Sequence, residues 1–309
     1  MMRDPEPALE GVLPLILADY RRFEILNASL ERFFPDLRTI YVIVPDADLR
    51  ALEVRIRNGR YRLVSELTVV PEFRLYPGVS GWMKQQLVKL AATKLVRSDW
   101  FLTLDADVIC AKNVRVRDLI IENRSACFAW QETEGVSEYA RWYRGAERLL
   151  RLPRPGVIHN VTPCVLNRAA VNQLQAYLRD LAYRKPFRLG RRALFTLLAR
   201  LAEAFLSSES VVRRHLSPWR LLLLSDPGWT EYSLYFTFLE GTGRFDDYHF
   251  RSEHPLFSRY SSLWFEEDIA GWDPSPAFSA RDPAFFLVVQ SSTGIPPEAV
   301  WQKIAPFLS

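Results

Sequence analysis

The sequence is poor in cysteine, with three residues in 309. Cys110, Cys127 and Cys164 form an odd set and lack the CxxC spacing of a metal site. This argues against a disulfide framework and for a reducing compartment. We therefore expect three buried thiols that pack as apolar side chains.

Long apolar runs and a strong excess of one charge are also missing. The run 12–18, VLPLILA, is too short to span a bilayer, and the preceding MMRDPEPALEG is too acidic and too poor in apolar residues for a secretory signal. The net charge of +4 is weak evidence for nucleic acid and is compatible with anionic small molecules. We expect a cytoplasmic protein with no nucleic-acid partner, whose membrane contact, if any, is peripheral at the inner face of the cell membrane.

Apolar and β-branched runs alternate with segments of helical periodicity along the chain. This alternation is typical of βαβ units, so we predict one α/β domain over 1–309, with a mixed, mostly parallel central sheet flanked by helices. The predicted strands are 12–18, 39–44, 61–70, 100–104, 125–130, 162–167 and 285–290. The predicted helices are 20–34, 46–59, 82–96, 137–151 and 168–182.

An acid pair, Asp105 and Asp107, directly follows the apolar strand 100–104. Ligands of parallel α/β sheets bind beyond the carboxyl ends of the strands. Two carboxylates one residue apart can converge on one hard cation, and oxygen ligands suit Mg²⁺ or Mn²⁺. Such an ion can hold a diphosphate and neutralise the charge of a departing nucleotide. The competing interpretation is that the aspartates cap the following turn.

The sequence around this pair resembles the GT-A glycosyltransferases, whose signature is an apolar strand ending in Asp-x-Asp. More narrowly, a largely uncharacterised bacterial family of GT-A-like transferases is similar to the segments GWMKQQLVKLAATKLVRSDWFLTLDADV, HNVTPCVLNR, WTEYSLYFTFLE, HPLFSRYSSLWF and FFLVVQSS. The resemblance covers most of 12–292. It implies a nucleotide-sandwich fold in which 1–110 bind the nucleotide-sugar donor and 111–309 the acceptor, with Asp105, Ala106 and Asp107 at the metal and diphosphate.

The resemblance also places residues near the nucleotide. At the ends of the first two strands these are Ala18, Asp19, Tyr20 and Asp46, although Asp19 could equally be the N-cap of helix 20–34.

Three polar residues, Lys84, Gln85 and Lys89, lie on what we predict to be the outward face of helix 82–96, in its first turns. An ammonium group near a helix N-terminus suits donor phosphate or sugar hydroxyls. The alternative is an ordinary solvated face.

A catalytic base is predicted in the second half of the chain. An inverting transferase needs a carboxylate that takes the proton from the acceptor hydroxyl, and Glu231, near the start of a helix, is our candidate. Tyr232 and Tyr235 could help to hold a sugar ring, and Asp226 is a reserve candidate. Alternatively, Glu231 completes a capping box and the tyrosines belong to the core. A retaining mechanism is equally open.

Two histidines are assigned to the same region. His254 precedes Pro255 and is the predicted third metal ligand, because GT-A enzymes often supply one late in the chain; a surface histidine is the alternative. His159 could face the acceptor pocket, and Gln290, at a strand end, could line the same cleft or simply satisfy backbone groups there.

Residues 183–224 form a predicted helical, basic insertion. Apolar side chains at helical spacing, beside arginines and Trp219, suit an anionic membrane surface, where a lipid-linked acceptor would be reached. A helix packed on its own domain explains the same pattern. The apolar positions are Leu194, Leu197, Leu198, Leu201 and Phe205.

The predicted activity is transfer of a sugar from a nucleotide-diphosphate donor, expected to be UDP-linked, to a hydroxyl of a glycan or lipid-linked glycan, with Mn²⁺ or Mg²⁺ as cofactor. A sugar-phosphate nucleotidyltransferase is the nearest rival, but it should carry a glycine-rich loop after the first strand, and ILADYRRFE contains no glycine. A non-catalytic nucleotide-sugar-binding module is the third possibility.

Overall fold

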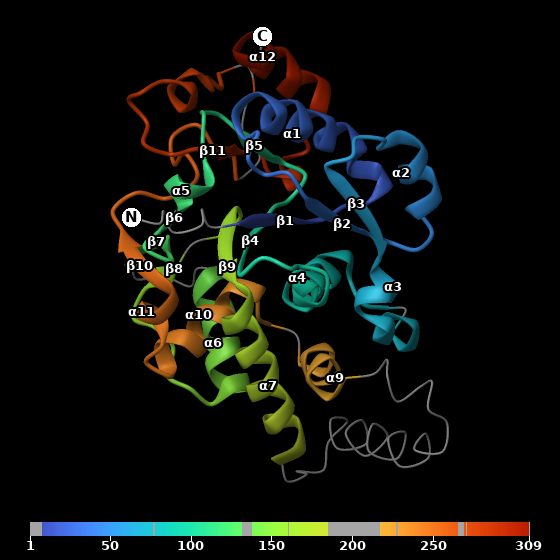
Figure 1. Ribbon diagram of the computed structural model, residues 1–309, viewed down its shortest axis with the longest axis vertical. Helices are drawn as coiled ribbons and strands as arrows, with labels where there is room; N and C mark the ends of the chain where they lie inside the picture. Colours follow the sequence, from blue (N-terminus) through green and yellow to red (C-terminus); the bar gives the residue numbers. More distant parts are fainter. Residues whose placement is uncertain are drawn as a thin grey trace, which may run out of the picture.

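The computed structural model describes residues 8–76, 78–131, 138–159, 161–184, 217–226, 228–264, 269 and 271–308. Its centre is a five-stranded sheet in the order β3-β2-β1-β4-β9, which confirms the predicted mixed, mostly parallel architecture (Figure 1). Four strands are parallel and β9 is antiparallel to β4. The strands are β1 (Leu9–Pro14), β2 (Ile40–Val44), β3 (Tyr61–Ser65), β4 (Trp100–Thr103) and β9 (Cys164–Asn167).

Both faces of this sheet are buried, because neighbouring residues of each strand enter different cores. In β4, Phe101 belongs to one apolar cluster, while Trp100 and Leu102 belong to the other. Buried parallel strands are apolar without interruption for this reason. The first cluster is covered by α4 (Gly81–Ala91), α6 (Glu138–Leu150), α7 (Arg168–Arg184), α9 (Pro218–Ser225) and α10 (Glu231–Gly241). The second is covered by α1 (Tyr20–Phe33) and α2 (Leu49–Arg55).

Two smaller sheets extend the structure. The strand β7 lies parallel to β10 and antiparallel to β6 and β8, and β5 pairs with β11 in antiparallel fashion. Their bounds are β5 (Val108–Cys110), β6 (Ile120–Ile121), β7 (Arg124–Trp130), β8 (Ile158–His159), β10 (His249–Ser252) and β11 (Phe286–Val288). Because β5 follows the acid pair, its pairing with β11 joins that turn to the C-terminal part of the chain.

Short helices and one terminal helix complete the described elements. The helix α12 (Pro297–Leu308) packs along α1, and Ile304 meets Ile25 in a third apolar cluster. No helix of the described ranges is both long and apolar enough to cross a membrane. The short helices are η1 (Leu17–Asp19), α3 (Glu66–Val69), η2 (Pro71–Leu75), η3 (Ala92–Lys94), α5 (Val116–Leu119), α11 (Phe245–Tyr248), η6 (Ser275–Phe278) and η7 (Ser291–Thr293).

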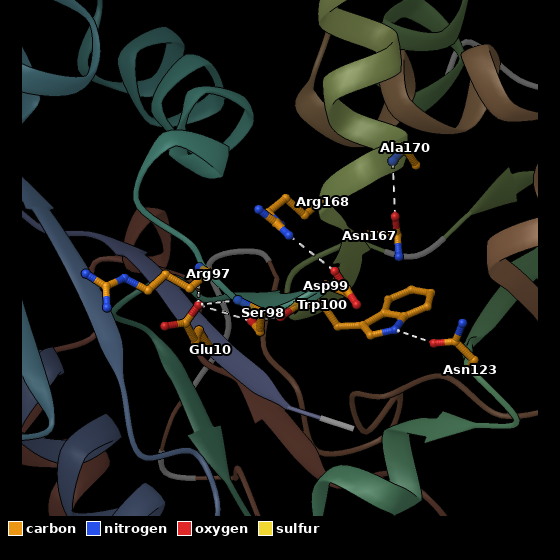
Figure 2. Close-up of polar contacts among 9 residues, drawn as sticks. All are labelled: Glu10, Arg97, Ser98, Asp99, Trp100, Asn123, Asn167, Arg168 and Ala170. Carbon is orange, nitrogen blue, oxygen red and sulfur yellow. Dashed lines mark hydrogen bonds and ion pairs between the residues drawn. The ribbon is translucent and has the colours of Figure 1, made fainter. Parts of the chain in front are cut away.

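The start of β4 is held by polar contacts at the end of the strand away from the acid pair. Figure 2 shows Glu10 accepting hydrogen bonds from the backbone amides of Arg97 and Ser98, at 2.6 and 2.9 Å. The indole of Trp100 donates to Asn123 Oδ1 at 3.3 Å. These bonds fix the register of the strand that carries the acid pair.

The structure corrects two predicted boundaries. The predicted strand 61–70 ends at Ser65, because the Ser65 hydroxyl accepts a hydrogen bond from Leu67 N and starts the short helix α3. The predicted first strand, 12–18, begins earlier and ends at Pro14.

The predicted insertion is described only in part. Residues 185–216, with the leucine stripe, lie outside the described residues. In α9, which follows them, Trp219 and Leu223 pack into the core. The Arg220 guanidinium, 2% exposed, forms an ion pair of 2.7 Å with the buried Glu72 of η2. Trp219 is therefore a core side chain rather than part of an exposed membrane-facing surface.

The helices α6 and α10 approach each other closely through Gly145. A Cβ atom built at Gly145 would lie 1.8 Å from the carbonyl oxygen of Gly228, in the loop before α10. Gly228 itself has φ +123°, a conformation that residues with a Cβ rarely adopt. The start of α10 is thus set by two glycines.

Replacing Gly145 should destabilise the protein although it lies in a helix. Gly145→Ala is expected to lower the free energy of unfolding by about 1–3 kcal/mol, since the clash outweighs the usual helical gain of about 0.5–1 kcal/mol. The control is Gly81→Ala, at the first residue of α4, where a Cβ meets no atom within 4 Å. Chemical denaturation measures both, and equal stabilities of the two variants would contradict the prediction.

Candidate functional site

The acid pair lies at the carboxyl end of β4, between the ends of β1 and β9. The Leu104 amide still donates to Val12 O of β1, and Asp105 and Asp107 follow in the turn before β5. Asp107 Oδ2 accepts a hydrogen bond of 2.9 Å from Ser291 N, and the Asp107 carbonyl accepts one from Val289 N. The C-terminal part of the chain therefore holds Asp107, and Asp105 is left to face the second half of the site.

A buried ammonium joins Asp105 to Glu231. Lys89 Nζ lies 2.8 Å from Asp105 Oδ1 and 2.9 Å from Glu231 Oε1. The Lys89 side chain is 1% exposed, so the prediction that it lies on the outward face of its helix is wrong. The reason is electrostatic: two carboxylates, from β4 and α10, supply the countercharge that a buried ammonium requires.

Glu231 is the first residue of α10, and the helix is capped without it. Thr230 is the N-cap, and its side chain forms a capping box with Ser233. The alternative role of Glu231 as the capping residue is therefore not the one observed. Its carboxylate is fully buried and points to Lys89.

Burial and charge oppose each other in the pKa values of this trio. Burial favours the neutral amine of Lys89, but Asp105 and Glu231 outweigh it and hold the pKa of Lys89 well above its usual value. Burial raises the pKa of Glu231, while the Lys89 charge works in the opposite direction. Lys89 therefore favours the ionised form of Glu231, against the effect of burial.

Asp105 also repels the other two carboxylates at this strand edge, Asp19 and Asp107. Burial first, and then the charge of Asp105, raise the pKa of Asp107 to about 7. Asp19 has a raised pKa for the same two reasons, opposed by Arg22. It occupies the N-cap position of α1 but makes no capping hydrogen bond through its side chain.

These acids fit the divalent cation that the sequence motif implies. A cation beside them would relieve the repulsion between Asp19, Asp105 and Asp107, and Mg²⁺ is usually held by one or two carboxylates completed by water and substrate phosphates. Within the described ranges, no group of three or more His, Cys, Asp or Glu side chains is arranged as a complete metal site. Asp105 and Asp107 would hold the ion together with the phosphate oxygens.

A cavity of about 340 Å³ opens beside the ion-paired trio. Lys89, Asp105 and Glu231 line it, together with His159 and Gln290. The remaining wall is mostly aromatic and polar, with two aliphatic side chains, and comprises Trp82, Gln86, Glu138, Tyr139, Trp142, Tyr143, Ile158, Val161, Thr162, Thr230, Tyr232 and Trp264. Aromatic faces with a few fixed polar groups are typical of a site for a sugar-sized ligand.

Tyr232 and Tyr235 have different roles. The Tyr232 hydroxyl is within hydrogen-bond distance of Thr103 Oγ1 (2.9 Å) and Thr162 Oγ1 (2.7 Å), and its ring lines the cavity. The Tyr235 hydroxyl meets His249 Nε2 at 2.8 Å inside the core. Both tyrosines belong to the same buried apolar cluster, but of the two it is Tyr232 that also lines the cavity, so the proposed sugar contact is open to Tyr232.

The predicted nucleotide-binding residues follow β1 and β2. Ala18 is exposed, and the Tyr20 ring lies 5.1 Å beneath the Arg55 guanidinium. Asp46 Oδ1 accepts a hydrogen bond from the Ser65 hydroxyl at 2.7 Å, and Lys84 forms an ion pair of 2.7 Å with Glu66. These polar groups share the strand edge with the acid pair.

Three other candidates do not line the cavity. Gln85 is half-buried on α4, and its neighbour Gln86 takes the place in the wall. Asp226 is buried, with Arg148 3.8 Å away. His254 is exposed, and its amide donates to the Ser252 hydroxyl in a local turn.

Sequence reasoning missed the aromatic wall. Trp82 and Lys89 are seven residues apart, so they share one face of α4, and Gln86 lies between them. That spacing was available in the sequence, whereas the positions of Tyr139, Trp142 and Trp264 depend on how α6 and the later loop pack.

The structure is therefore an α/β fold with an acid pair at a strand end and an aromatic cavity beside it. The chain belongs to the family of unknown function DUF6492, whose model matches residues 6–309. No curated protein matches the chain.

Solved structures show a distant likeness. One is 4-diphosphocytidyl-2C-methyl-D-erythritol synthase from Anaerococcus prevotii DSM 20548, at 14% identity and a TM-score of 0.35, covering 65% of this chain and 85% of that one. Another is galactosyltransferase LgtC in complex with donor and acceptor sugar analogs, at 14% identity and a TM-score of 0.33, covering 67% and 82%.

The buried ion pair predicts a clear double-mutant result. Lys89→Met should lower the free energy of unfolding by about 3–5 kcal/mol at neutral pH, because Glu231 loses its countercharge. Adding Glu231→Gln should recover part of that loss, since the uncompensated charge is removed.

The matched control is Lys84→Met, on the same helix. Its ion pair with Glu66 is partly exposed, so the expected loss is within about 1 kcal/mol. Chemical denaturation of these three variants and the unmodified protein measures the differences; a double variant less stable than Lys89→Met would contradict the coupling.

Proposed function

We propose that this protein is a metal-dependent glycosyltransferase. It moves a sugar from a nucleotide-diphosphate donor, which we expect to be UDP-linked, to a hydroxyl of a glycan or lipid-linked glycan. The observation that carries the proposal is the convergence of Asp105 and Glu231 on Lys89 at the wall of one aromatic cavity. The Lys89 ammonium contacts both Asp105, the acid at the proposed donor end, and Glu231, the acid proposed as the base.

In this proposal, residues 1–110 bind the donor. The nucleotide would lie beyond the ends of β1 and β2, near Ala18, Asp19, Tyr20 and Asp46. When bound, the cation supplies positive charge that offsets the charge developing on the leaving diphosphate.

In this proposal, residues 111–309 bind the acceptor, and Glu231 is the catalytic base. A sugar hydroxyl in the cavity would give its proton to the Glu231 carboxylate while its oxygen forms the bond to the anomeric carbon, and the bond from that carbon to the donor phosphate breaks. Lys89 favours the ionised, proton-accepting form of Glu231. Tyr232, tied to two threonine hydroxyls, is a rigid surface for the sugar ring.

A panel of nucleotide sugars tests the proposal. With Mg²⁺ or Mn²⁺, at least one donor should be hydrolysed slowly and should raise the melting temperature. Asp105→Asn should abolish the cation-dependent stabilisation, and Glu231→Gln should lower the turnover rate by about 10²–10⁴-fold while donor binding persists.

The matched control is Asp99→Asn, which removes an exposed acid at the other end of β4. It should leave both measurements unchanged. If no donor gives hydrolysis or stabilisation with either metal, the proposal fails. Turnover of a nucleoside triphosphate with a sugar phosphate would instead identify a nucleotidyltransferase.

A further inference from the structure

A basic groove adjoins the cavity. Its volume is about 940 Å³, and Arg141, Arg144 and Arg148 line it from one face of α6. The spacing i, i+3 and i+7 places the three side chains in a row along the helix. None of the described residues that line the groove is acidic, so its charge is not balanced within it.

The arginines at the front of this row are available to a ligand. Arg141 and Arg144 are exposed and have no ion-pair partner among the described residues. Arg148 has Asp226 3.8 Å away, a distance at the limit of an ion pair. Arginine presents a planar set of donors that matches phosphate oxygens.

Two tryptophans belong to both the groove and the cavity. Trp82 and Trp142 line each of them, and their rings stack with centroids 5.6 Å apart and an interplanar angle of 27°. Trp82 is 42% exposed, unusually high for a large aromatic side chain. The groove and the cavity therefore adjoin at the tryptophan pair.

Charge separates the two compartments. The cavity holds Glu231, Asp105 and Glu138 against Lys89, whereas the charged side chains that line the groove are all cationic among the described residues. A neutral sugar ring suits the cavity, and an anionic group is favoured in the groove. Neither acid of the Asp105–Asp107 pair lines the groove, so this anion is distinct from the donor diphosphate.

We infer that the acceptor is a phosphorylated sugar, with its phosphate or diphosphate in the arginine groove and its reacting hydroxyl in the cavity beside Glu231. The inference rests on the proposed function for the role of acceptor, but the binding that it predicts does not require catalysis.

The experiment compares two probes that differ only in the diphosphate: octyl glucosyl diphosphate and octyl glucoside. Isothermal titration without divalent cation should show tighter binding of the diphosphate probe. Arg141→Ala/Arg144→Ala should weaken it by at least about tenfold and leave octyl glucoside unchanged. Higher salt should reproduce part of this loss.

Controls separate this inference from the proposed function. Asp105→Asn should keep the preference for the diphosphate probe over octyl glucoside, because the groove does not include that acid and any effect on the sugar is common to both probes. Arg50→Ala/Arg179→Ala removes two exposed arginines elsewhere and should have no effect. Donor hydrolysis should persist in Arg141→Ala/Arg144→Ala.

Three outcomes would overturn the inference. The first is equal affinity for both probes. The second is a preference for the diphosphate probe that Asp105→Asn abolishes and the arginine variant retains. The third is arginine-dependent binding to phosphatidylglycerol vesicles without any preference for the diphosphate probe, which would assign the groove to a membrane surface. Loss of donor hydrolysis in every assay with normal probe binding would refute the proposed function alone.

Discussion

The arrangement of the site depends on one buried ammonium. Lys89 requires two carboxylates because it is withdrawn from water, and it obtains them from the end of β4 and the start of α10. Elements far apart in sequence are thereby held at one point. The same charge that stabilises the fold also favours ionisation of Glu231, so stability and the proposed chemistry share a single interaction.

Other contacts also help to place these partners. Glu10 and Asn123 hold the start of β4, so that Asp105 emerges at the opposite end. Gly145 lets α6 approach the loop before α10, and the Thr230 cap starts that helix with Glu231 at its first position. Because α6 also carries the three arginines, its close approach to α10 sets the groove beside the cavity.

The resulting surface is graded in charge from one end to the other. Repelling carboxylates lie where a cation and the donor diphosphate are proposed, the partly compensated trio lies at the proposed reacting centre, and arginines without acidic neighbours in the groove lie beside the tryptophan pair. A transferase that joins two anionic substrates would need such a separation, because like charges must be kept apart while their neutral sugars meet.

The sequence alone determined the sheet, the strand-end position of Asp105 and Asp107, and the burial of the three cysteines, because periodicity and apolar runs are local properties. It also singled out Glu231 and Lys89, but it placed Lys89 on the outer face of its helix. Only the tertiary structure decided that Lys89 turns inward and that Trp82 and Trp142 join a groove to a cavity. The direction of an amphipathic side chain depends on countercharges and packing partners that belong to other elements of the fold, such as Glu231 of α10, and no local pattern records them.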